Sequence, residues 1–184
     1  MTENPALALI EVGSLSRAYV VLDAVVKKAP VTVVQYAEVS PGKTILVMVG
    51  QVSSVEESLE EARVRSAEAL LDHLILPAVH PGVVAALQGK PVVQDVVALG
   101  VLETNTAAAA VRASDAGLKA AEVWLIKLRL AAGIGGKGLA LFTGPLADVE
   151  AALDAAQEAA GAEGFLGREL IPQPHPEIVG RFTG

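Results

Sequence analysis

The sequence predicts an α/β fold of the α+β type, in which one small domain occurs twice. Three observations lead to this prediction. The chain of 184 residues repeats itself at a spacing of 92 to 95 residues, each copy carries the signals β-α-β-β-α-β, and 52% of residues are hydrophobic while 19% are charged. Disordered chains have a lower share of hydrophobic residues and a higher net charge, so this chain is expected to fold. Because domains average roughly 150 residues, we expect two small domains, residues 5–90 and 95–184.

The repeat includes charged, glycine, proline and histidine residues, which distinguishes it from chance similarity between two apolar segments. A spacing of 92 residues aligns Glu11 with Glu103 and Asp23 with Asp115. Insertions in the second copy raise the spacing to 94 and then to 95. Further aligned pairs are Lys27 with Lys119, Gly42 with Gly136, Lys43 with Lys137, and His80 with His175. We call residues paired in this way matched residues.

The first helix of the chain has clear signals at both ends. Ser14 can cap its N-terminus, and Pro30 stops it after about Lys28. Its apolar residues recur at steps of three and four, which is the period of an amphipathic helix. These residues are Leu15, Tyr19, Leu22 and Val26.

The remaining elements follow from similar patterns. Short apolar or β-branched segments predict strands, turn residues predict a hairpin, and Ser53 with Glu56 forms a capping box for a second helix. The first copy has strands at 6–12, 31–39, 44–49 and 74–76, and its second helix extends to about residue 71. The second copy has strands at 97–103, 123–130, 139–143 and 165–171 and helices at 107–120 and 146–160; residues 87–94 form a linker. This order predicts a ferredoxin-like domain, an antiparallel four-stranded sheet with helices on one face.

Composition and charge exclude several classes of function. The net charge of −7 disfavours binding to nucleic acid or to an anionic membrane surface. The absence of cysteine excludes disulfides and thiolate ligands, and no apolar run reaches the length of a membrane span. The N-terminus lacks the features of a signal peptide, so we expect a cytoplasmic protein. The mean hydropathy of +0.49 is high for so small a chain, which indicates that some apolar surface is buried between subunits.

The chain resembles the tandem bacterial microcompartment (BMC) domain proteins, which form the shells of bacterial enzyme compartments. The resemblance covers essentially the whole chain. It rests on residues 23–31 and 115–123, on the Gly/Lys loop before the third strand of each copy, and on the Pro-x-x-His-Pro endings at 77–81 and 172–176. The resemblance implies a homotrimer whose six domains form a pseudohexameric tile, which joins other shell proteins at its edges and passes small metabolites through a central pore.

The Gly/Lys loops are the candidate pore residues. The resemblance implies that they converge on the symmetry axis; the residues are Ser40, Pro41, Gly42, Lys43, Gly133, Ile134, Gly135, Gly136 and Lys137. The residues alone favour simple structural turns, because Gly and Pro are the usual residues of hairpin loops, and only the resemblance reverses this preference. A phosphate-binding loop is rejected, because Lys43 leads into a predicted strand instead of a helix. The side chains of Lys43 and Lys137 either add positive potential to the pore or point along the strands to solvent.

Residues 133–137 and the chain length are especially similar to the T-type members of propanediol-utilization shells. In those members a cysteine of the first loop binds an iron–sulfur cluster on the axis. This chain has Ser40 at that position. Because such clusters need thiolate ligands, we expect neither this cofactor nor any other.

The candidate tile-edge residues are Lys27, Lys119, His80 and His175. The resemblance implies that the lysines contact backbone carbonyls of a neighbouring tile, although a lysine near a helix C-terminus is favourable by itself. Ala78 and Gln173 replace an arginine found in other members, which weakens the expected contact between tiles. Histidines beside proline are also common as surface or capping residues, and no metal site is expected.

The sequence contains no hydrolase or zinc-protease motif, so we expect no enzyme. Glu11 and Glu103 could form a carboxylate pair, but their repetition favours a structural role such as binding the amides of a neighbouring loop. Two hypotheses of function remain. The first is a structural shell tile, and the second is a trimeric or dimeric ferredoxin-like regulator that binds a small molecule.

Overall fold

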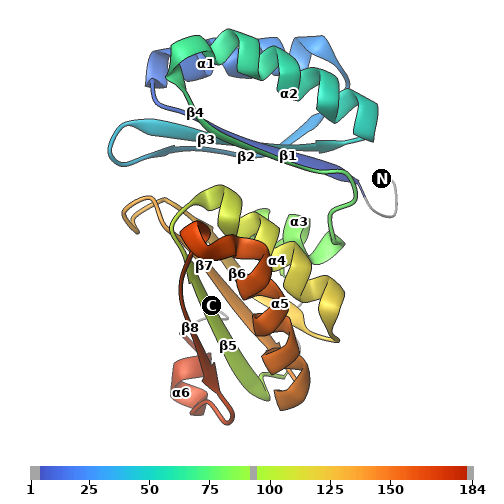
Figure 1. Ribbon diagram of the computed structural model, residues 1–184, viewed down its shortest axis with the longest axis vertical. Helices are drawn as coiled ribbons and strands as arrows, with labels where there is room; N and C mark the ends of the chain where they lie inside the picture. The colour runs from blue at the N-terminus through green and yellow to red at the C-terminus, as the bar shows by residue number, and fades with distance from the viewer. Residues whose placement is uncertain (1–4, 92–94, 182–184) are drawn as a thin grey trace. The chain divides into compact units, whose positions relative to one another are not determined.

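A computed structural model describes residues 5–91 and 95–181, which form two compact units, one up to Pro81 and one from Gly82. Each unit contains one sheet with two long helices on one of its faces (Figure 1). Residues 92–94 of the expected linker lie outside the described residues. No helix within the described ranges is long and apolar enough to cross a membrane.

The first unit confirms the expected order of elements. Its elements are β1 (Ala6–Val12), α1 (Leu15–Lys28), β2 (Thr32–Val39), β3 (Lys43–Gly50), α2 (Val52–Ser66), the short 3₁₀ helix η1 (Ala67–Ala69) and β4 (Leu70–Leu76). The strands form an antiparallel sheet in the order β2-β3-β1-β4. This is the arrangement expected of a ferredoxin-like domain.

The second unit repeats this architecture. Its main elements are β5 (Ala98–Thr104), α4 (Ala107–Ala120), β6 (Trp124–Leu130), β7 (Gly138–Gly144), α5 (Leu146–Gly164) and β8 (Phe165–Ile171). The sheet order, β6-β7-β5-β8, is equivalent to that of the first unit. Two short helices, α3 (Pro81–Leu87) and α6 (Pro176–Val179), were not predicted from the sequence.

The ends of two helices differ from the sequence prediction. Helix α2 ends at Ser66 instead of residue 71, because Ala67 adopts a left-handed φ of 46°. The strand that follows therefore begins at Leu70, four residues earlier than predicted. Helix α5 is assigned as far as Gly164, but Gly161 has a φ of 73° and interrupts the regular helix next to the predicted end. Neither difference alters the order of the sheet.

Helix α1 packs on its sheet through small residues. Ala18, Val21 and Val25 are buried against β1 and β3, where Ile10 and Met48 belong to the same core. The larger apolar residues that mark the helix in the sequence lie on other sides of it: Leu22 is half-buried, and Leu15, Tyr19 and Val26 are exposed. Periodicity therefore identified the helix, but not the side that faces the core.

Candidate functional site

The first Gly/Lys loop is a tight turn between β2 and β3. Ser40, Pro41 and Gly42 are exposed, and the amide of Gly42 donates a hydrogen bond to the carbonyl of Val39 at 2.9 Å. Gly42 has a φ of 97°, a conformation that side chains disfavour. The loop therefore presents a serine hydroxyl and backbone to solvent at one end of the sheet.

The second Gly/Lys loop is longer and holds itself together with backbone hydrogen bonds. The amide of Ala131 donates to Lys137 at 2.8 Å, and the amide of Ile134 donates back to Ala131 at 3.2 Å. Arg129 adds a bond from its guanidinium to the carbonyl of Ala132 at 3.0 Å. Positive φ angles at Gly133, Gly135 and Gly136 allow this compact winding. Here too, the exposed groups are mainly backbone.

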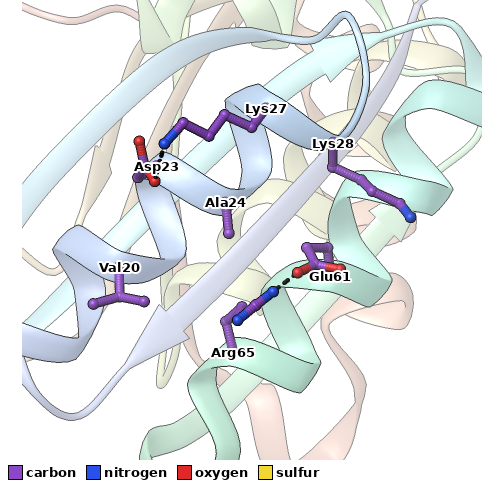
Figure 2. A pocket seen from close by; sticks show the side chains of 7 residues that line it. All are labelled: Val20, Asp23, Ala24, Lys27, Lys28, Glu61 and Arg65. Atoms are coloured by element: carbon purple, nitrogen blue, oxygen red, sulfur yellow. Dashed lines mark hydrogen bonds and ion pairs between the residues drawn. The ribbon is translucent and has the colours of Figure 1, made fainter.

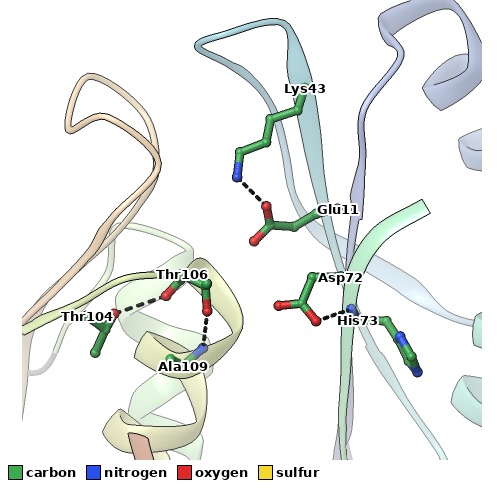
Figure 3. A network of polar contacts seen from close by, with 7 residues as sticks. All are labelled: Glu11, Lys43, Asp72, His73, Thr104, Thr106 and Ala109. Carbon is green, nitrogen blue, oxygen red and sulfur yellow. Dashed lines mark hydrogen bonds and ion pairs between the residues drawn. The ribbon is translucent and has the colours of Figure 1, made fainter. Parts of the chain in front are cut away.

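Each loop ends in a lysine that forms an ion pair with the first strand of its own unit. Lys43 Nζ lies 2.5 Å from Glu11 Oε2 (Figure 3), and Lys137 Nζ lies 2.7 Å from Glu103 Oε1. Both lysines turn back along the strands, and their ammonium groups end on carboxylates instead of free in solvent. The partner of each glutamate is thus a lysine ammonium, in place of the loop amides that we expected.

The two ion pairs differ in burial. The side chains of Glu11 and Lys43 are 4% and 17% exposed, whereas those of Glu103 and Lys137 are 44% and 47% exposed. The second carboxylate oxygen of Glu11 is buried and has no hydrogen-bond partner among the described residues. Both pairs are formally neutral, so neither loop carries an uncompensated lysine.

The lysines predicted for the tile edges lie in the last turns of α1 and α4. Lys27 pairs with Asp23 at 2.7 Å, and Lys119 pairs with Asp115 at 2.6 Å, each within one helix. The Lys27 pair is largely exposed, whereas Asp115 is buried. The same local arrangement therefore recurs in both units.

The two histidines have different surroundings. His80 is half-buried between β4 and α3. His175 is exposed and caps α6, because its Nδ1 accepts a hydrogen bond from the amide of Glu177 at 3.3 Å. Within residues 5–91 and 95–181, no group of three or more His, Asp or Glu side chains has the arrangement of a metal site.

A groove beside Lys27 was not predicted from the sequence. It lies between α1 and α2, has a volume of about 330 Å³, and is lined by Lys28, Glu61 and Arg65 as well as Lys27 (Figure 2). Arg65 donates a hydrogen bond to Glu61 at 2.6 Å, which lowers the pKa of that carboxyl. The signal in the sequence was the run of charged residues at 56–63, which lies on α2. This run does not by itself predict a groove, because the groove forms only where α2 packs beside α1.

The groove has no charged equivalent in the second copy. The residues matched to Lys28, Glu61 and Arg65 are Ala120, Ala155 and Ala159. The Asp–Lys pairs of α1 and α4 are thus common to both units, whereas the additional charges of the groove belong only to the first. The two predicted edges of a chain are therefore chemically different.

Comparison with known proteins adds family information to this geometry. The model of the BMC domain family matches residues 6–79 and 98–174. The bacterial microcompartment shell protein PduT of Citrobacter freundii is 34% identical over 176 residues, which cover 95% of this chain and 96% of that protein.

Solved structures give the same result. A microcompartment protein from Desulfitobacterium hafniense DCB superposes with a TM-score of 0.93 at 32% identity, covering 96% of this chain and 99% of that chain. A fused, permuted hexameric shell protein from the RMM microcompartment has a TM-score of 0.61 at 26% identity, covering 84% and 80%. These relatives favour the shell hypothesis over the small-molecule regulator.

Proposed function

Because the chain belongs to the BMC domain family and is a structural protein of a microcompartment shell, we propose that three copies form a pseudohexameric tile with the two Gly/Lys loops around a central pore. The supporting observation is the matched pair of exposed loops at equivalent ends of two equivalent sheets. A ring of three chains would bring six such loops to one axis.

The proposed pore is polar and close to neutral at its rim. Ser40 contributes a hydroxyl, the glycines contribute accessible amides, and the lysine of each loop is compensated by its glutamate. Such a rim can form hydrogen bonds with small polar metabolites without a strong preference for either sign of charge. In this proposal the chain acts as a conduit and not as an enzyme.

An iron–sulfur cluster does not fit this loop. Ser40 supplies a hydroxyl where a thiolate would be required, and the chain contains no cysteine at any position. We therefore propose that the tile has no redox cofactor. The proposed partners are other copies of the chain, other shell proteins at the tile edges and the metabolites that pass through the pore.

The mass of the purified chain tests the trimer. Light scattering should give three times the chain mass of 18.9 kDa, and electron microscopy should show hexagonal particles that pack into sheets at higher concentration. A monomer or dimer at every concentration would contradict the proposal.

Cross-linking tests whether the loops converge. Since the chain has no cysteine, Ser40→Cys introduces a single thiol, which a trifunctional maleimide should link into covalent trimers. Ser53→Cys provides a matched control, because Ser53 is also exposed but lies on α2. Equal cross-linking of the two variants would argue against a pore at Ser40.

A further inference from the structure

The groove between α1 and α2 carries more positive than negative charge. Three cations line it, namely Lys27, Lys28 and Arg65, and so do two carboxylates, those of Asp23 and Glu61 (Figure 2). Three cations against two carboxylates leave one positive charge. The chain as a whole has a net charge of −7. The groove is therefore a local exception to the acidic character of the protein.

The groove is a property of the first unit alone, because all of its lining residues lie on two helices of that unit. These helices are fixed to each other beside the groove. The buried hydroxyl of Ser58 on α2 donates a hydrogen bond to the carbonyl of the buried Val25 on α1 at 3.2 Å. Packed helices hold the side chains of a binding site in a more constant geometry than loops do.

Both carboxylates of the groove already have a cationic partner. Asp23 pairs with Lys27 at 2.7 Å, and Glu61 accepts a hydrogen bond from Arg65 Nε at 2.6 Å. The pKa of Glu61 is lowered mainly by this hydrogen bond, and to a smaller extent by the charges of Arg65 and Lys28. Glu61 is therefore ionised at neutral pH and held by Arg65, so its charge is already compensated.

The cations of the groove keep hydrogen-bond donors that no carboxylate uses. Within the described part of the chain, the ammonium of Lys28 makes no hydrogen bond or ion pair. A guanidinium has five N–H donors, and in the same residues Arg65 uses only the donor on Nε, which leaves both of its Nη groups. A groove lined by unused donors and an excess of positive charge favours a ligand that is an anion and a hydrogen-bond acceptor.

The size of the groove limits the ligand. Its volume of about 330 Å³ is at the lower end of the range for small-molecule sites. Arginine binds phosphate and carboxylate groups through two parallel hydrogen bonds, and lysine adds a point charge. The chemistry of the groove therefore fits a phosphate group or a short dicarboxylate.

The second copy indicates that the domain does not need these charges in order to fold. It keeps the Asp–Lys pair as Asp115 and Lys119, but alanine occupies the positions matched to Lys28, Glu61 and Arg65. The second unit nevertheless forms the same sheet with two long helices. The additional charges of the first unit are therefore available for a role other than folding.

We propose that this groove is a binding site for a small dianion, which Arg65 and Lys28 hold directly and Lys27 borders. The inference goes beyond the proposed pore and does not need the trimer, because every residue of the site belongs to one unit of one chain. Lys27 is also a candidate tile-edge residue, so the bound dianion would lie beside the proposed edge.

Calorimetry with simple anions tests the site. Inorganic phosphate and succinate, titrated into the full chain at constant ionic strength, should bind saturably at one site per chain. Acetate, which has a single charge, should bind more weakly. Saturation by phosphate alone would identify the ligand class as phosphates, and saturation by succinate alone would identify it as dicarboxylates. Absence of saturable binding for both would overturn the proposal, whether or not the chain is trimeric.

A double variant locates the binding. Lys28→Ala with Arg65→Ala should weaken binding by at least about tenfold, because two charge-assisted interactions are lost. Arg17→Ala with Arg63→Ala is the matched control, since it also removes one exposed cation from each helix but neither residue lines the groove. Arg63 pairs with Glu60 much as Arg65 pairs with Glu61. Equal loss of binding in both double variants, or unchanged binding in the first, would overturn the assignment.

A single variant separates binding from folding. Lys28→Ala breaks no ion pair of the described residues. The variant should therefore keep the thermal unfolding midpoint of the anion-free chain while it binds phosphate or succinate more weakly. Wild-type affinity in Lys28→Ala would overturn the role of this ammonium.

Discussion

Lys43 Nζ lies 2.5 Å from Glu11 Oε2 in a nearly buried ion pair. The matched Lys137 and Glu103 form an equivalent ion pair that is exposed to solvent. Identical chemistry therefore occurs in two environments within one chain. Removing one partner of a buried pair leaves the other charge buried and uncompensated. When one partner of an exposed pair is removed, water solvates the remaining charge. The two copies therefore allow the effect of burial on the stability of a Glu–Lys pair to be measured within one chain.

The first prediction concerns this difference. Lys43→Met should lower the free energy of unfolding by about 3 kcal/mol, the lower end of the range for broken buried pairs, because Lys43 keeps some contact with water. Lys137→Met should change it by less than about 1 kcal/mol. Denaturant unfolding of both variants measures the difference.

Glu11→Gln added to Lys43→Met should recover part of the loss, because it removes the stranded charge. Equal destabilisation by the two lysine variants would show that burial does not decide the strength of these pairs.

The second prediction concerns the charge at the proposed pore. Ser40→Asp would add one carboxylate per chain to an exposed loop whose lysine is already paired. In a trimer, the three carboxylates should make tiles in a planar bilayer more permeable to cations than to anions, as the reversal potential under a salt gradient would report. Ser53→Asp, on α2, should leave that potential unchanged. A shift of the same size in both variants would indicate a general charge effect and no pore at Ser40.

Much of the fold could be predicted because local signals and tertiary packing agree. The strand Ala6–Val12 and the helix Leu15–Lys28 have the predicted bounds, since Ser14 caps the helix and Pro30 follows it. The end of α2 could not be predicted, because Ala67 adopts a positive φ without the glycine that usually marks such a turn.

The candidate site was predictable at the level of residues but not of contacts. The repeat identified Glu11 and Lys43, yet their pairing depends on the register of β1 with β3, which brings residues 32 positions apart together. The same reason applies to the groove at Arg65, which forms only when α2 packs on α1. Helix periodicity cannot distinguish a side that packs on the sheet from one such as Tyr19 that is left exposed.

The third prediction concerns the tile edges. Lys27→Ala with Lys119→Ala should abolish sheets while the trimer remains, if these lysines contact neighbouring tiles. Loss of the exposed Lys27–Asp23 pair should cost at most about 0.5 kcal/mol, whereas loss of Lys119 removes a partner of the buried Asp115 and should cost more. Denaturant unfolding of the double variant therefore has to show that the chain is folded under the conditions of the assembly experiment. Light scattering and negative-stain images of the same samples measure the two properties.

Arg63→Ala is the control for this experiment, because Arg63 forms a similar exposed pair with Glu60 but lies on α2. Sheets of normal appearance in the double lysine variant would place the edges elsewhere. Loss of sheets in the Arg63 variant as well would show that assembly responds to surface charge in general.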